Sequence, residues 1–237
     1  MNVLIVYAHE EPLSFNAALR DTAIQAFEGQ GHTVIVSDLY GMDFKAVADS
    51  EDFHQRKDRH LLKRQAEELH ALQLGTLAHD ILGEQDKLKA ADLVILQFPL
   101  WWFGLPAILK GWVDRVMTMG FAYGGGKWYD QGGLKGKRAM LSLTTGGPEP
   151  IYGPRGINGP MDRILFPIQH GILFFCGFEV LSPFIAYAPA RASEVERARM
   201  LADYAERLQN LENGSPIPFH GLDHYGDGMQ LKVEFPD

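Results

Sequence analysis

The stretch DLVILQFPLWWFGLPAILKGWVDRV, residues 92–116, decides the fold. Residues 93–98 form a short and almost wholly apolar run, which is typical of a strand buried on both faces of a sheet. Pro106 stands where the first residue of a helix would be, and we expect that helix over residues 107–119. A buried strand followed by a helix is the unit from which parallel α/β sheets are built.

The same alternation continues on both sides of this stretch. Further strands are predicted at residues 2–8, 33–39, 138–145 and 178–183. Further helices are predicted from the Ser14 cap to about Gly29, over residues 78–89, after residue 160 to about Gly171, and from the Ser193–Glu196 capping box to about Leu211. We therefore expect an α/β fold with a doubly wound, five-stranded parallel sheet and helices on both faces.

Composition limits the class of protein. A hydrophobic content of 46% supports one domain over residues 1–237, with a polar helical insertion around 42–79 and an irregular tail after 214. The net charge of −8 argues against nucleic-acid partners and against an anionic membrane surface. Cys176 is the single cysteine, which fits a reducing, cytoplasmic setting. The apolar start is broken at His9 and predicts a first strand, not a signal peptide, and no segment predicts a membrane span.

In an open parallel sheet, ligands bind beyond the carboxyl ends of the strands, where this sequence places three unusual loops. The first, residues 9–16, has no glycine-rich fingerprint, so it suggests a phosphate held at a helix start with Ser14 and Asn16. The alternative is a capped helix with no ligand.

The second loop, residues 99–104, carries three consecutive aromatics, some of which should face a planar ligand or a partner subunit. Ordinary core filling is the alternative. In the third, residues 144–147, the N–H groups of Gly146 and Gly147, with Tyr152 nearby, could stabilise an anion. A plain turn is the alternative there.

No metal constellation is visible, because the nine histidines show neither an HExxH pattern nor a Cys/His spacing. Cys176 lies in an apolar run and is expected in the core.

Several longer stretches together resemble the FAD-dependent NAD(P)H:quinone oxidoreductases of the DT-diaphorase type. They are AHEEPLSFNAAL, SDLYGMDF, EQDKLKAADLVILQFPLWWFGLPAILKGWVDRV, TTGGPEPIYGPRGINGPM and FPIQHGILFFCGFEVL. The resemblance implies a flavodoxin-like fold, an FAD cofactor and a homodimer with its sites at the interface. It also implies two-electron transfer from a reduced nicotinamide to a quinone-like acceptor by ping-pong hydride transfer through flavin N5.

Carried over to this sequence, the family's FAD contacts fall on His9, Phe15, Asn16, Ala18, Pro99, Leu100, Trp101, Trp102, Phe103, Thr144, Thr145, Gly146, Gly147, Tyr152 and Arg197. Tyr123 and Phe175 match an aromatic lining of the substrate pocket that the other subunit contributes, and Trp102 and Phe103 should wall that pocket. Gly146, Gly147 and Tyr152 are suited to stabilise the negative charge that a hydride leaves on the flavin.

The sequence departs from the DT-diaphorase pattern at two positions, and it departs from a sister branch of that family at a third. Asn158 replaces a histidine that pairs with the catalytic tyrosine. The sister branch, which uses ribosyl-dihydronicotinamide, has the same replacement, so the sequence does not decide which hydride donor is preferred. Of that branch's metal ligands only His170 is matched, and Phe174 replaces the second, so we expect no metal. Gly125 replaces a pocket aromatic and should leave the pocket more open.

Two other functions remain compatible with these residues. One is a flavin-binding cytoplasmic regulatory subunit of a potassium efflux system, and the other is an azo- or nitro-reductase with the same chemistry. A flat apolar pocket accepts many planar molecules, so the sequence does not choose the acceptor.

Overall fold

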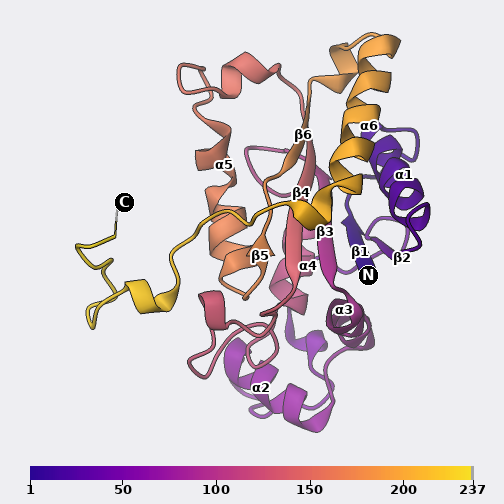
Figure 1. Ribbon diagram of the computed structural model, residues 1–237. Helices are drawn as coiled ribbons and strands as arrows, with labels where there is room; N and C mark the ends of the chain where they lie inside the picture. Colours follow the sequence, from indigo (N-terminus) through magenta and orange to yellow (C-terminus); the bar gives the residue numbers. More distant parts are fainter. Residues whose placement is uncertain (236–237) are drawn as a thin grey trace.

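A sheet of six strands runs through the computed structural model, which describes residues 1–235 (Figure 1). The strands are β1 (Asn2–Tyr7), β2 (Thr33–Asp38), β3 (Leu93–Pro99), β4 (Arg138–Thr145), β5 (Glu179–Val180) and β6 (Phe184–Tyr187). The α-helices are α1 (Phe15–Glu28), α2 (Arg64–Leu74), α3 (His79–Ala90), α4 (Ala107–Val116), α5 (Met161–Ile168) and α6 (Glu194–Gln209). The alternation of strands and helices confirms the predicted α/β class.

All paired strands are parallel, in the order β2-β1-β3-β4-β5, with β6 also paired to β4. The chain leaves β1 toward β2 on one side and returns to β3 on the other. Such a reversal opens a crevice beyond the carboxyl ends of β1 and β3, where ligands bind in open α/β sheets.

The fifth position of the sheet differs from the single strand predicted at residues 178–183. β5 pairs only with Arg138 and Ala139 at the start of β4, and pairing resumes in β6, which lies beside the end of β4. Pro183 lies between the two pieces and has no backbone N–H to donate to a ladder, which explains the interruption.

Helices cover both faces of the sheet. Val3, Ile5 and Tyr7 of β1 pack with α1 and α6, and their neighbours Leu4 and Val6 pack with α3, α4 and α5. Figure 1 shows α1 and α6 together on one side and α5 on the other. Since β1 is buried on both faces, its sequence is continuously apolar instead of alternating.

Two helix ends differ from the predicted ones. α4 ends at Val116, three residues before the predicted end at 119. The helix predicted to stop near Gly171 instead continues from α5 into a π-helical turn, Gln169–Phe174. The tail after residue 214 then crosses the edge of the sheet, where the Ile217 N–H donates to the Val180 carbonyl at 2.7 Å.

One buried arginine anchors residues 42–79 to helix α4. The Arg115 side chain, on α4, is 1% exposed and its Nε donates to Asp52 Oδ1 at 2.9 Å. The same guanidinium bonds the Asp80 carboxylate and donates to the Lys45 carbonyl at 2.8 Å. Arg64 of α2 donates to the other oxygen of Asp52 at 3.1 Å. This shared pairing fixes α2 relative to α4.

We predict that Arg115→Met lowers the free energy of unfolding by about 3–5 kcal/mol, because it leaves the buried Asp52 carboxylate without its main partner. Lys110→Met on the same helix is the matched control. It removes an exposed pair with Asp114 and should cost less than about 1 kcal/mol. Urea unfolding of both variants measures the difference. Equal losses would show that the buried pair does not anchor this segment.

Candidate functional site

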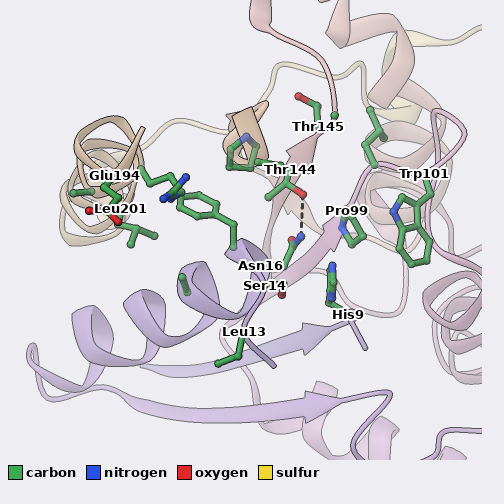
Figure 2. A pocket seen from close by; sticks show the side chains of 18 residues that line it. His9, Leu13, Ser14, Asn16, Pro99, Trp101, Thr144, Thr145, Glu194 and Leu201 are labelled. Carbon is green, nitrogen blue, oxygen red and sulfur yellow. Dashed lines mark hydrogen bonds between the residues drawn. The ribbon is translucent and has the colours of Figure 1, made fainter. Parts of the chain in front are cut away.

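Loops at the carboxyl ends of three strands line one cavity of about 880 Å³, with the start of α6 closing its far side (Figure 2). The lining residues are His9, Leu13, Ser14, Phe15, Asn16, Ala18, Pro99, Leu100, Trp101, Thr144, Thr145, Gly146, Pro189, Ala190, Glu194, Arg197, Ala198 and Leu201. Most of the residues predicted for cofactor binding are therefore brought together within a single chain.

The start of α1 offers free hydrogen-bond donors to this cavity. Ser14 caps the helix, and its hydroxyl accepts from the Ala17 N–H at 3.1 Å. The backbone N–H groups of Phe15 and Asn16 donate to no group within residues 1–235. His9 Nδ1 accepts from the Glu11 N–H at 3.0 Å, which leaves Nε2 to carry the proton of the neutral ring. This end of the cavity is built to hold an anion.

A buried chain of hydrogen bonds lies beneath the cavity. Asn16 Nδ2 donates to Thr144 Oγ1 at 2.9 Å, the bond dashed in Figure 2, and Gln97 Nε2 donates to Asn16 Oδ1 at 2.9 Å. All three residues are buried. They belong to α1, β3 and β4, so the chain ties together the elements that carry the three loops. Nothing in the sequence marked Gln97, since a lone glutamine in an apolar strand has no motif.

The loop after β3 is a tight and strained turn. The backbones of Trp101 and Gly104 exchange two hydrogen bonds, at 3.2 and 2.9 Å. Between them, Trp102 and Phe103 have φ angles of +50° and +58°, a left-handed conformation that is unfavourable for bulky side chains. The turn points both rings outward, with Trp102 98% exposed, so neither lines the cavity within one chain.

The loop after β4 presents backbone donors. The Thr145 hydroxyl donates to the Gly147 carbonyl at 2.8 Å and holds the turn, while the N–H groups of Gly146 and Gly147 donate to nothing within residues 1–235. A Cβ at Gly146 would meet open space, whereas one at Gly147 would lie 2.4 Å from Ile151 Cδ1. A side chain at Gly147 would therefore have to displace the end of the Ile151 side chain.

Tyr152 and Asn158 belong to the same loop but lie outside the cavity lining. The Tyr152 ring packs 5.8 Å from the ring of Tyr187, and burial raises the pKa of Tyr187, with Glu149 adding to the effect. The Asn158 N–H donates to the Ile151 carbonyl at 3.0 Å, which folds residues 151–158 into a compact loop.

Helix α6 supplies the part of the cavity that sequence analysis largely missed. Only Arg197 was expected there, yet Glu194, Ala198 and Leu201 also face the cavity. The Arg197 guanidinium is steadied by donation to the Ala192 carbonyl. The predicted capping box, in which Ser193 and Glu196 exchange hydrogen bonds, was the available signal, because it fixes where this helix begins.

Tyr123 and Phe175 line a different hollow, of about 470 Å³, between α2 and the π-helical turn. Their ring centroids are 5.4 Å apart, and the Tyr123 hydroxyl accepts from Gln65 Nε2 at 3.2 Å. Within one chain these two aromatics and the cofactor cavity thus form separate sites.

His170 is surrounded by aromatic rings, including those of Tyr129, Phe166, Phe174 and Phe219. Burial lowers its pKa. Within residues 1–235, no group of three or more His, Cys, Asp or Glu side chains is placed to hold a metal ion. Cys176 is buried as predicted, and burial raises its pKa to about 12, so its thiol stays protonated.

A family model for the flavodoxin-like fold matches residues 1–210, so the class of the protein is flavodoxin-like. The human ribosyldihydronicotinamide dehydrogenase [quinone] is 48% identical over 225 residues, covering 94% of this chain and 97% of its own length. The NAD(P)H dehydrogenase [quinone] 1 of Cavia porcellus is 45% identical, covering 99% of this chain and 87% of its own.

A solved structure from Klebsiella pneumoniae, assigned as a quinone reductase, superposes with a TM-score of 0.96 at 46% identity, covering 99% of this chain and 95% of its own. Because these relatives are similar over nearly the whole chain, they place the protein in one family within the flavodoxin-like class. The protein belongs to the NAD(P)H:quinone oxidoreductase family, which confirms the resemblance found in its sequence. No helix within residues 1–235 has both the length and the apolar character needed to cross a membrane.

We predict that Gln97→Leu lowers the free energy of unfolding by about 1–3 kcal/mol, because Asn16 Oδ1 is left buried without its donor. Gln25→Leu, at an exposed position of α1, is the control and should change it by no more than about 0.5 kcal/mol. Thermal and urea unfolding report both variants. Wild-type stability in Gln97→Leu would mean that the buried chain does not hold the loops.

Proposed function

We propose that the protein is an FAD-dependent oxidoreductase that transfers two electrons from a reduced nicotinamide to a quinone in a ping-pong sequence. The observation that carries the proposal is the single cavity formed by the loops after β1, β3 and β4, in a chain of the quinone oxidoreductase family. The related enzymes are named for quinone reduction, and the cavity gives a flavin a place at the expected edge of the sheet.

The residues of the cavity fit a flavin dinucleotide. The free N–H groups of Phe15 and Asn16, with the imidazole of His9, suit the pyrophosphate. Phe15 and Leu201, beside the Arg197 guanidinium, make an apolar and cationic compartment suited to an adenine. A mononucleotide would end at its single phosphate and leave this compartment unused, so the shape of the cavity favours FAD over FMN.

Once bound, the flavin supplies the electron-transfer chemistry, and the protein supplies position and charge. The N–H groups of Gly146 and Gly147 donate to nothing else within residues 1–235, and preorganised donors of this kind would stabilise negative charge on a bound flavin without reorganising. The Tyr152 phenol, which belongs to the same loop, would add a third donor. Trp102 and Phe103, which point away from the cavity within one chain, would wall the face where nicotinamide and quinone bind in turn once a second copy covers them, so both substrates would use one site.

We further propose that the protein works as a homodimer. Trp102 and Phe103 are 98% and 53% exposed, and Ile157 and Phe166 are also exposed, which is unusual for large apolar side chains. Tyr123 and Phe175 lie in a separate hollow of the same chain, so only a second copy brings them to the cofactor cavity. A two-fold contact would cover the exposed rings and complete both sites.

The steady-state test varies the nicotinamide donor at several fixed concentrations of a benzoquinone. Because both substrates use one site in turn, double-reciprocal plots should give parallel lines, and high quinone should compete with the donor. NADH, NADPH and ribosyl-dihydronicotinamide are compared in the same assay to identify the donor. A protein that carries FAD but oxidises none of the three would contradict the proposed activity.

Tyr152→Phe should slow the reduction of bound FAD roughly tenfold without releasing it, since two backbone donors remain at the same charge. Asn158→His should add a titration near pH 6.5 to that step, because histidine exchanges a proton there and asparagine does not. Stopped-flow reduction from pH 5 to 9 measures both. If Tyr152→Phe reacts at the wild-type rate and Asn158→His shows no new titration, the loop only shapes the pocket.

The dimer is tested by sedimentation at micromolar concentration, alongside activity. Wild type should sediment as a dimer, and Phe166→Glu should weaken it, because a charge would be buried at the contact. Val195→Glu, at an exposed apolar position on α6, is the control and should leave the dimer intact. Full activity in a 26.5 kDa species would refute the proposal.

A further inference from the structure

Positive charge is concentrated in one short segment that the proposed reaction does not use. Residues 54–64, HQRKDRHLLKR, contain five of the 22 lysine and arginine residues, two histidines and a single acid, Asp58. The whole chain has a net charge of −8, so the positive charge of this segment is opposite in sign to that of the whole protein. It joins the first short turn of the insertion to α2, at the bottom of the view in Figure 1.

Part of this segment folds around a hollow of about 480 Å³ that is lined by His54, Gln55, Arg56, Arg59 and His70. The lining contains two guanidinium groups and two imidazoles but no carboxylate. None of its residues belongs to the cofactor cavity, so the hollow is a separate feature.

The walls of the hollow rest on a small apolar core of Phe53, Ala71, Leu77 and Ile81. Phe53 and Ala71 directly adjoin His54 and His70 in the chain, so packing fixes the backbone on both sides. The His54 N–H donates to the Thr76 carbonyl at 2.9 Å, and its ring lies 5.4 Å from that of His79. The backbone that carries the two histidines of the hollow is therefore held in place.

Some of the charged side chains near the hollow have hydrogen-bond partners within the protein, and others have none. Arg56 Nη2 donates to the Asp58 carbonyl at 2.6 Å, and its Nε lies 3.3 Å from Glu67 Oε1. Glu67 is further occupied by the N–H groups of Lys57 and Asp58, at 2.6 and 3.0 Å. The Asp58 carboxylate accepts from backbone N–H groups of the next turn.

The side chains of Arg59 and His70, in contrast, make no hydrogen bond or ion pair within residues 1–235. One arginine is thus fixed in place, and a second arginine and a histidine keep all their donors available. The acids beside them are already occupied by other donors.

We propose that this hollow binds a phosphate group, either free or carried by a small organic molecule. Arginine presents paired N–H donors that match the oxygens of phosphate, and charge-assisted bonds of this kind are the strong ones. Two imidazoles flank the arginines and add further donors. The hollow is wide enough for an organic group beside the phosphate.

Isothermal titration calorimetry tests the proposal on the FAD-loaded protein in phosphate-free buffer of low ionic strength. Inorganic phosphate and adenosine 2′-monophosphate are titrated separately. Each should bind at one site per chain, and tighter binding of the nucleotide would identify an organic phosphate, whereas equal affinity would identify the free anion. Absence of binding by both overturns the proposal.

Arg59→Gln should weaken binding about tenfold, because it removes the charged, paired donors that have no other partner, and His70→Ala should do the same, because it removes an unpartnered imidazole donor. Lys57→Gln is the matched control, since it removes one charge from the same segment without touching the lining, and binding should stay within about twofold of wild type. FAD content and quinone reduction should be unchanged in all three variants, so this outcome is independent of the proposed catalysis. Equal weakening in Lys57→Gln and Arg59→Gln would show only diffuse attraction and would overturn the site.

Discussion

The cavity depends on the buried hydrogen bonds that join Gln97, Asn16 and Thr144. These residues lie on β3, at the start of α1 and at the end of β4, and each element carries one of the loops that line the cavity. Apolar packing alone would hold the elements together but would fix their relative positions less sharply, because it has no direction. Two directional bonds in a dry environment set the spacing, since leaving any of these polar groups unpaired is costly.

The loops that line the cavity, next to these buried hydrogen bonds, have features that suit a ligand more than they stabilise the fold. Trp102 and Phe103 adopt left-handed backbone conformations and expose their rings, and the N–H groups of Gly146 and Gly147 remain unused. Such features lower the stability of an isolated chain, and they fit the proposal that a planar cofactor and a second subunit occupy this edge. The separate position of Tyr123 and Phe175 fits the same explanation.

The sequence predicted the parts of the fold that local pattern controls. Residues 2–8 and 93–98 are almost wholly apolar, and they form the central strands β1 and β3 as expected. The break between β5 and β6 was missed because residues 178–183 were interpreted as one strand, although Pro183 at its end cannot donate to a ladder and pairing with β4 resumes only in β6. The π-helical turn after α5 was missed for a similar reason, since it changes hydrogen bonding without changing the hydrophobic period.

The three loops of the candidate site were located from sequence because ligands bind at strand ends and because those loops carry unusual residues. Gln97 and the inner face of α6 were not located, since their roles come from contacts between residues far apart in the chain. The resemblance to a known family supplied Arg197 alone from that helix. Tertiary contacts of this kind leave no local signal in a single sequence.

We propose above all that the three loops and α6 form one site shaped for FAD. Fluorescence titration of the flavin-free protein with FAD and with FMN tests it most directly, in wild type and in Arg197→Ala. We predict that FAD binds at least about tenfold more tightly than FMN, and that Arg197→Ala removes most of this preference while leaving FMN affinity unchanged. Equal affinity for FAD and FMN in wild type would contradict it, because the compartment beside α6 would then bind nothing.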